Sequence, residues 1–62
     1  MKAGNWIVAE IEENGEAGII ATMMNDYHAN YHTKAKRIIL AGCTERTAKS
    51  RAHCEAIMAR IK

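Results

Sequence analysis

The dipeptide Asn14-Gly15 is the feature that most constrains the fold, because it separates two runs rich in apolar residues, WIVAEIEE and EAGIIATM. A type I′ turn needs positive φ at both central residues, and Asn followed by Gly adopts that conformation readily. We therefore predict an antiparallel hairpin over about residues 6–23. A two-residue turn also fixes the register, in which Glu13 pairs with Glu16 and every further pair follows.

In this register both faces of the hairpin are apolar near its open end. A hairpin alone is only marginally stable in water, so at least one face has to be covered. We expect one face to pack against helices of the same chain and the other to be left for a partner. The residues predicted to form this outer, partner-binding face are Trp6, Val8, Ile19 and Met23.

The segment after the hairpin has two interpretations. At about 100° per residue, its apolar residues fall on one stripe of a helix over about residues 26–41. The alternative makes KRIILAG a third strand, which gives the order ββ-β-α. We prefer the helix, because the run from Arg37 to Leu40 lacks the alternation of a strand and a long irregular loop would precede it. Gly42 then suits the position after the helix, where positive φ is favourable.

A second helix is predicted over about residues 45–62, with Thr44 as its N-cap and Glu45 in its first turn. This completes a predicted α+β fold of the order ββαα. We expect the larger apolar face of the helix, with Cys54, Ile57, Met58 and Ile61, to pack on the hairpin. A second face consists of alanines, and we predict Ala52 and Ala56 on it as contacts to another chain.

The length of 62 residues predicts one small domain over residues 1–62. A domain of this size buries only about 60% of its unfolded surface and usually needs a disulfide, a metal or a partner subunit. We therefore expect a homo-oligomer, with a dimer favoured. No apolar run approaches the roughly 20 residues of a membrane span. The two cysteines fit reduced thiols in the cytoplasm.

Charge is divided unevenly along the chain. Residues 1–32 hold one base against five acids, a net charge of −4, and residues 33–62 hold eight bases against two acids, a net charge of +6. The division suggests a basic surface for an acidic partner, complementary surfaces within an assembly, or simply a solvated surface. Nucleic-acid binding is therefore the alternative function, since such side chains neutralise phosphates. Its predicted residues are Lys34, Lys36, Arg37, Arg46, Lys49 and Arg60.

A zinc site is a minor alternative, because His28, His32, Cys43 and Cys54 together offer two histidine and two cysteine ligands. On the predicted helix Cys43 would lie roughly 20 Å from His28, whereas zinc–ligand bonds measure about 2.0–2.3 Å. We therefore assign no metal ligands. We also assign no catalytic residues and no cofactor, since His53 is badly placed to activate the neighbouring Cys54 and no phosphate-binding or dinucleotide motif is present.

The segment KAKRIILAG resembles small accessory proteins of bacteriophages and prophages, in which a hairpin precedes an A-x-R-(I/L)-I-x-A core. Ala35, Arg37, Ile38, Ile39 and Ala41 carry this resemblance. It implies a regulator or inhibitor that occupies a surface on a larger host protein, and it assigns no functional residues. Together with the apolar faces described above, it predicts a small binding protein that acts by protein–protein contact and self-association in the host cytoplasm.

Overall fold

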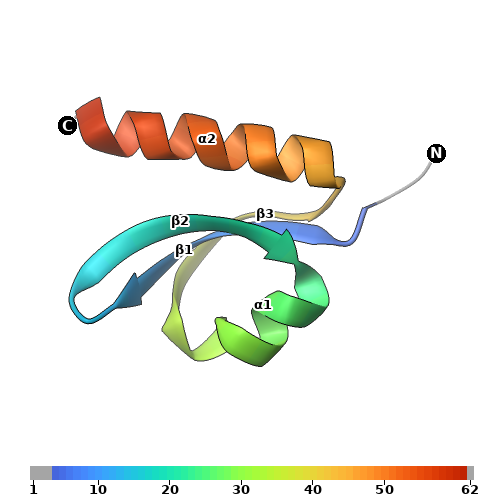
Figure 1. Ribbon diagram of the computed structural model, residues 1–62, viewed down its shortest axis with the longest axis horizontal. Coiled ribbons are helices and arrows are strands. Elements are labelled where there is room, and N and C mark those ends of the chain that lie inside the picture. Colours follow the sequence, from blue (N-terminus) through green and yellow to red (C-terminus); the bar gives the residue numbers. More distant parts are fainter. Residues whose placement is uncertain (1–3, 62) are drawn as a thin grey trace.

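The computed structural model describes residues 4–61. Three strands, β1 (Trp6–Glu13), β2 (Glu16–Met23) and β3 (Ala35–Cys43), form one antiparallel sheet in the order β2-β1-β3. The short helix α1 (Met24–Asn30) and the 3₁₀ turn η1 (His32–Lys34) connect β2 to β3, and α2 (Glu45–Ile61) follows. The sheet lies between α2 and α1 (Figure 1). The predicted α+β class, with a hairpin followed by helices, is confirmed.

The hairpin has the predicted ends and register. Asn14 and Gly15 form the turn with φ values of 56° and 82°. Glu13 pairs with Glu16, and the pairing continues without a shift to Trp6 and Met23. The observed register is therefore the one that the two-residue turn specifies.

The single helix predicted over residues 26–41 is wrong. The α-helix ends at Asn30, the 3₁₀ turn η1 follows, and from Ala35 the chain pairs with β1 as a third strand, which was the alternative interpretation. The strand satisfies the second edge of β1, whose backbone groups would otherwise face away from the sheet without partners. It also brings Lys34, Lys36 and Arg37 next to carboxylates at the far end of β1.

Gly42 belongs to β3 and does not terminate a helix. Its φ is 77°, and it is the extra residue where the register shifts between the pairs Ile7–Ala41 and Trp6–Cys43. A bulge residue with positive φ favours glycine because it has no Cβ. The positive φ expected at this position is therefore present, for a different structural reason.

Gly42→Ala should lower the free energy of unfolding by about 1–2 kcal/mol, the usual cost of a left-handed backbone for a residue with a Cβ. Gly18 is the matched control, since its φ is not positive and a Cβ there would meet no atom within 4 Å. We expect Gly18→Ala to be neutral or stabilising by up to about 1 kcal/mol. Urea unfolding followed by circular dichroism measures both. Equal losses for the two variants would contradict the bulge assignment.

The core lies on both faces of β1, the central strand. On the α1 side, Ile7 and Ala9 are 2% and 0% exposed and pack with Tyr27 of α1. Tyr31 and Ala35, from the predicted helical stripe, also pack against this cluster although the long helix is absent. On the α2 side, Val8 and Ala48 are each 0% exposed. The two-faced apolar hairpin is thus covered by one helix on each side.

The predicted orientation of the second helix is also wrong. α2 begins as predicted, since the N–H of Thr47 donates to Oγ1 of Thr44 at 3.3 Å. It presents its alanine face to the sheet, however, with Ala48 buried and Ala52 half-buried. A single residue, Thr44, separates β3 from α2, so the strand fixes the rotation of the helix as it starts. Small side chains there let the helix lie close over Val8.

Candidate protein-binding surface

The larger apolar face of α2 is exposed. We call Cys54, Ile57, Met58 and Ile61 the α2 apolar surface; its three large residues are 43%, 64% and 76% exposed, in that order, and Cys54 is exposed too. The spacing is i, i+3, i+4 and i+7, which places all four on one side of a helix. Sequence patterning identified these residues but assigned them to the core, because the alanine stripe has the same periodicity and only packing decides between the two.

A groove runs between the C-terminal half of α2 and the sheet, with a volume of about 340 Å³. Its lining combines apolar and charged residues: Glu10, Ile19, Arg37, Glu55, Met58 and Ala59. The groove opens because contact between α2 and the sheet decreases along the helix, from the buried Ala48 to the exposed Ala59. Met58 therefore belongs both to the α2 apolar surface and to the rim of this groove.

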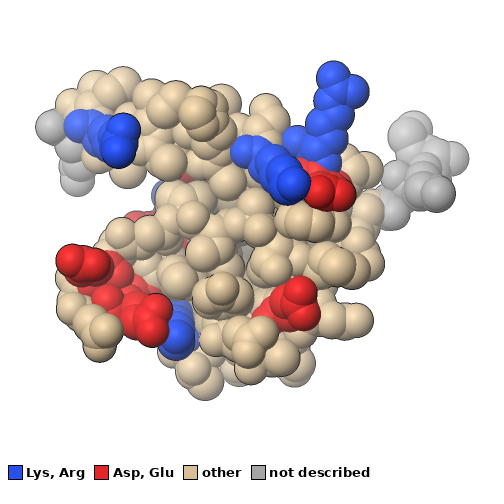
Figure 2. Space-filling view, in the orientation of Figure 1, with Lys and Arg blue, Asp and Glu red and all other residues tan. Residues whose placement is uncertain are grey.

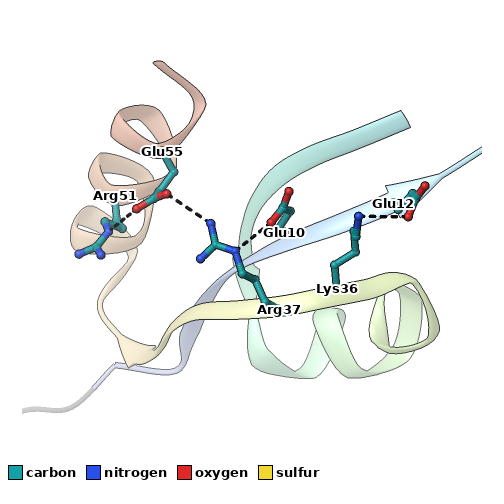
Figure 3. Close-up of polar contacts among 6 residues, drawn as sticks. All are labelled: Glu10, Glu12, Lys36, Arg37, Arg51 and Glu55. Carbon is teal, nitrogen blue, oxygen red and sulfur yellow. Dashed lines mark hydrogen bonds and ion pairs between the residues drawn. The ribbon is translucent and has the colours of Figure 1, made fainter. Parts of the chain in front are cut away.

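Arg37 bridges the sheet and α2 beside this groove (Figure 3). Its guanidinium lies 2.9 Å from the Glu10 carboxylate and 3.8 Å from the Glu55 carboxylate, which also accepts a hydrogen bond from Arg51 at 3.1 Å. Half-exposed ion pairs of this kind contribute little stability, about 0–1 kcal/mol each. They connect the middle of α2, through Glu55, with β3 and β1, through Arg37 and Glu10.

The predicted outer sheet face is not left open, because α2 covers it. Val8 is fully buried beneath the helix and cannot contact a partner of the folded chain, which corrects its assignment. Trp6 and Ile19 are half-buried, and the Lys49 ammonium lies 5.8 Å from the centre of the Trp6 ring. Met23 is 39% exposed. Of the two predicted alanines, Ala52 is half-buried and Ala56 is exposed.

Most residues predicted for nucleic-acid binding are engaged by carboxylates of the same chain. Lys34, Lys36 and Arg37 pair with Glu13, Glu12 and Glu10 of β1, and Lys49 pairs with Glu45. Arg46 and Arg60 have no ion-pair partner among residues 4–61. The opposite charges of the two halves of the chain are thus largely matched within the molecule.

The histidines and cysteines do not converge. The rings of His28 and His32 are stacked at a tilt, with centroids 5.2 Å apart. The Cys43 thiol donates to the Trp6 carbonyl at 3.4 Å, and Cys54 lies on α2. Within the described residues no three His, Cys, Asp or Glu side chains form a cluster able to hold a metal ion.

Comparison of the chain with protein-family models, curated proteins and solved structures found no match. Within the described part of the chain, neither helix combines the length and the apolar character needed to cross a lipid bilayer. The α2 apolar surface therefore has to be explained from its own chemistry.

Proposed function

We propose that this chain is a small non-catalytic binding protein that acts by protein–protein contact in the cytoplasm. Its binding element is α2, which lies in an apolar groove of a larger protein and regulates or inhibits that protein, in the manner of the phage accessory proteins that the sequence resembles. Self-association as a homodimer is part of the same proposal. The observation that carries it is the α2 apolar surface.

Three large apolar side chains, Ile57, Met58 and Ile61, are exposed on the C-terminal half of α2. Large exposed apolar patches on soluble proteins mark interaction sites. The spacing of Cys54, Ile57, Met58 and Ile61 is the anchor pattern of helix-in-groove recognition, in which residues i, i+3, i+4 and i+7 enter pockets of the partner. α2 is held on the sheet by its opposite face, so it is already helical before binding and loses little conformational entropy.

Nucleic-acid binding gains no comparable support. A phosphate contact through Lys34, Lys36, Arg37 or Lys49 would have to displace a carboxylate that lies 2.8–3.4 Å from the basic group. The two remaining arginines of the predicted set, Arg46 and Arg60, are too few to give strong phosphate binding, which typically uses several neutralised phosphates.

Photo-crosslinking tests the proposed surface. A benzophenone amino acid in place of Met58 should form an adduct with a larger protein in the cell that naturally makes this chain. The matched control is the same probe in place of Ile38, which is 56% exposed but lies on β3 away from α2. A pattern of adducts that is the same at both positions, or no adduct at position 58, would contradict the proposal.

The double variant Ile57→Ser, Ile61→Ser should abolish the crosslink from position 58 while changing stability by less than about 1 kcal/mol, because exposed positions contribute little to folding. Thermal unfolding of the variant measures the second part of this expectation. A collapsed melting temperature would instead place these side chains in the core of the monomer in solution.

A further inference from the structure

Only four charged side chains within residues 4–61 lack an ion-pair partner there, and they divide evenly by sign. The acids are Glu16 and Asp26, and the bases are Arg46 and Arg60. Every other described Lys, Arg, Asp and Glu lies within 4 Å of an opposite charge; these residues are Glu10, Glu12, Glu13, Lys34, Lys36, Arg37, Glu45, Lys49, Arg51 and Glu55.

The two arginines lie on one stripe of α2. They are 14 residues apart, which is close to four helical turns, so the stripe places them about 21 Å apart on the same side. Glu55 lies on the flank of α2 that faces β3, because its carboxylate pairs with Arg37, and Arg51 pairs with Glu55 on the same flank. The arginine stripe is turned away from the buried Ala48, on the side of α2 opposite to Arg51 and Glu55. Figure 2 shows basic side chains at both ends of α2 on this face of the molecule.

The two acids lie across β2 from the arginines. Glu16 opens β2, which is about 23 Å long, and Asp26 is in α1 three residues after β2 ends. On the same face of the molecule, Figure 2 shows acidic side chains near the hairpin turn and over α1. The length of the strand between the two acids is therefore close to the spacing of the two bases along the helix.

α2 runs in the opposite direction to β2. Its first turns lie over the open end of the hairpin, where Lys49 meets Trp6, and Met58 shares the groove with Ile19 nearer the turn. Arg46 is thus at the same end of the molecule as Asp26, and Arg60 is at the same end as Glu16. Each end of the molecule therefore has a base from α2 and an acid from β2 or α1. Figure 1 shows β2 running between α2 and α1 in this view.

We propose that this face binds a second copy of the chain about a two-fold axis parallel to β2. Rotation about that axis places the α2 side of one copy opposite the α1 side of the other. The hairpin-turn ends of the two copies stay together, and so do the open ends of their hairpins. Arg60 of each copy then faces Glu16 of the second copy, and Arg46 faces Asp26. The contact is isologous, so it closes after two subunits and forms four ion pairs. This inference rests on the proposed function and deepens it by assigning the self-association to one face.

The same charges disfavour the other obvious dimer. If two β2 edges paired as antiparallel strands of one continuous sheet, the axis would be perpendicular to the sheet and both α2 helices would lie on the same side. Each arginine stripe would then face the other, and the acids would likewise face acids, which is unfavourable. The half-buried Ile19 and the exposed Met23 belong to β2 itself and supply apolar contact in the proposed arrangement.

Charge exchange tests the axis. In sedimentation velocity at low salt, Arg60→Glu and Glu16→Arg should each weaken dimerisation about tenfold, because each places like charges together at two sites. An equimolar mixture of the two variants should recover the wild-type affinity, since the new carboxylate at position 60 of one chain then faces the new guanidinium at position 16 of the other. The double variant in one chain should recover it as well. Arg46→Glu with Asp26→Lys provides a second, independent exchange.

The outcomes are distinguishable from those of the crosslinking experiment. Recovery of the dimer affinity in the mixture supports the proposed axis. If both single variants weaken dimerisation and the mixture does not restore it, the proposed axis is overturned. A wild-type chain that sediments as a monomer also overturns it. If position 58 still crosslinks to a larger protein in that case, the proposed function stands without the dimer. Increased salt should dissociate the dimer if the axis is right, because exposed ion pairs are screened.

Discussion

Ile7→Ala should remove most of the stability of this protein. Ile7 is 2% exposed on the central strand and packs with Ala9 and Tyr27. Deletion of a buried isoleucine side chain to alanine typically costs about 2–5 kcal/mol, through lost burial and the cavity that remains. The free energy of unfolding of a chain of 62 residues is typically only about 3–9 kcal/mol. Urea unfolding followed by circular dichroism measures the change.

Ile38 provides the control for this prediction. It lies on the neighbouring strand, pairs with Ala9 and is 56% exposed. Ile38→Ala should therefore cost under about 1 kcal/mol, mostly through the lower strand preference of alanine. If both substitutions had the same effect, the core would not be centred on β1 as the structure has it.

Ala48→Leu should lift α2 from the sheet. Ala48 is 0% exposed, where the first turns of the helix lie over the sheet. A leucine adds three carbon atoms where no space is left, and such overpacking costs about 1–3 kcal/mol. The N-terminal half of α2 is also where the helix is seated, so we expect amide hydrogens throughout α2 to exchange faster. Hydrogen exchange with mass spectrometry of α2 peptides measures this.

Ala56→Leu is the matched change two turns further along the same helix. Ala56 is exposed, so leucine there should alter stability by less than about 0.5 kcal/mol. The pair of variants also tests which face of α2 is buried. If Ala48→Leu were tolerated and Ile57→Ser were strongly destabilising, the larger apolar face would be turned inward in solution.

The hairpin was predictable in full because its determinants are adjacent in the sequence. Asn14 and Gly15 specify the turn, and the period of two along a strand leaves one register once the turn is set. The cap of α2 was predictable for the same reason, since Thr44 contacts a backbone group only three residues away. Features of this kind need no knowledge of the tertiary structure.

β3 was predicted only as the alternative to a helix, because three extra residues conceal its alternation. Lys36, Ile39 and Gly42 stand at the three register shifts against β1. Without them the order is Ala35, Arg37, Ile38, Leu40, Ala41 and Cys43, which alternates between the α1 face and the α2 face along the whole strand. A bulge cannot be located from periodicity alone, because the residue that breaks the pattern is identified only by the partner strand.

The interaction surfaces were predictable in composition but not in position. The pattern of α2 separates an alanine face from a larger apolar face, yet the inward face is decided by the link through Thr44 and by the close approach of Ala48 to the sheet. The net charges of the two halves of the chain could likewise be read from the sequence. That most of them are matched within the chain follows from β3 lying beside β1, a pairing that the sequence pattern concealed.

The bulges of β3 have a consequence for how the protein behaves when concentrated. Fibril growth needs two sheet edges on each molecule, so that every added copy offers a template to the next. The edge of β2 is regular over eight residues, whereas the edge of β3 is interrupted by bulges that make its hydrogen-bonding groups uneven. A molecule with one regular edge offers a template on one side only, so strand pairing cannot propagate from copy to copy.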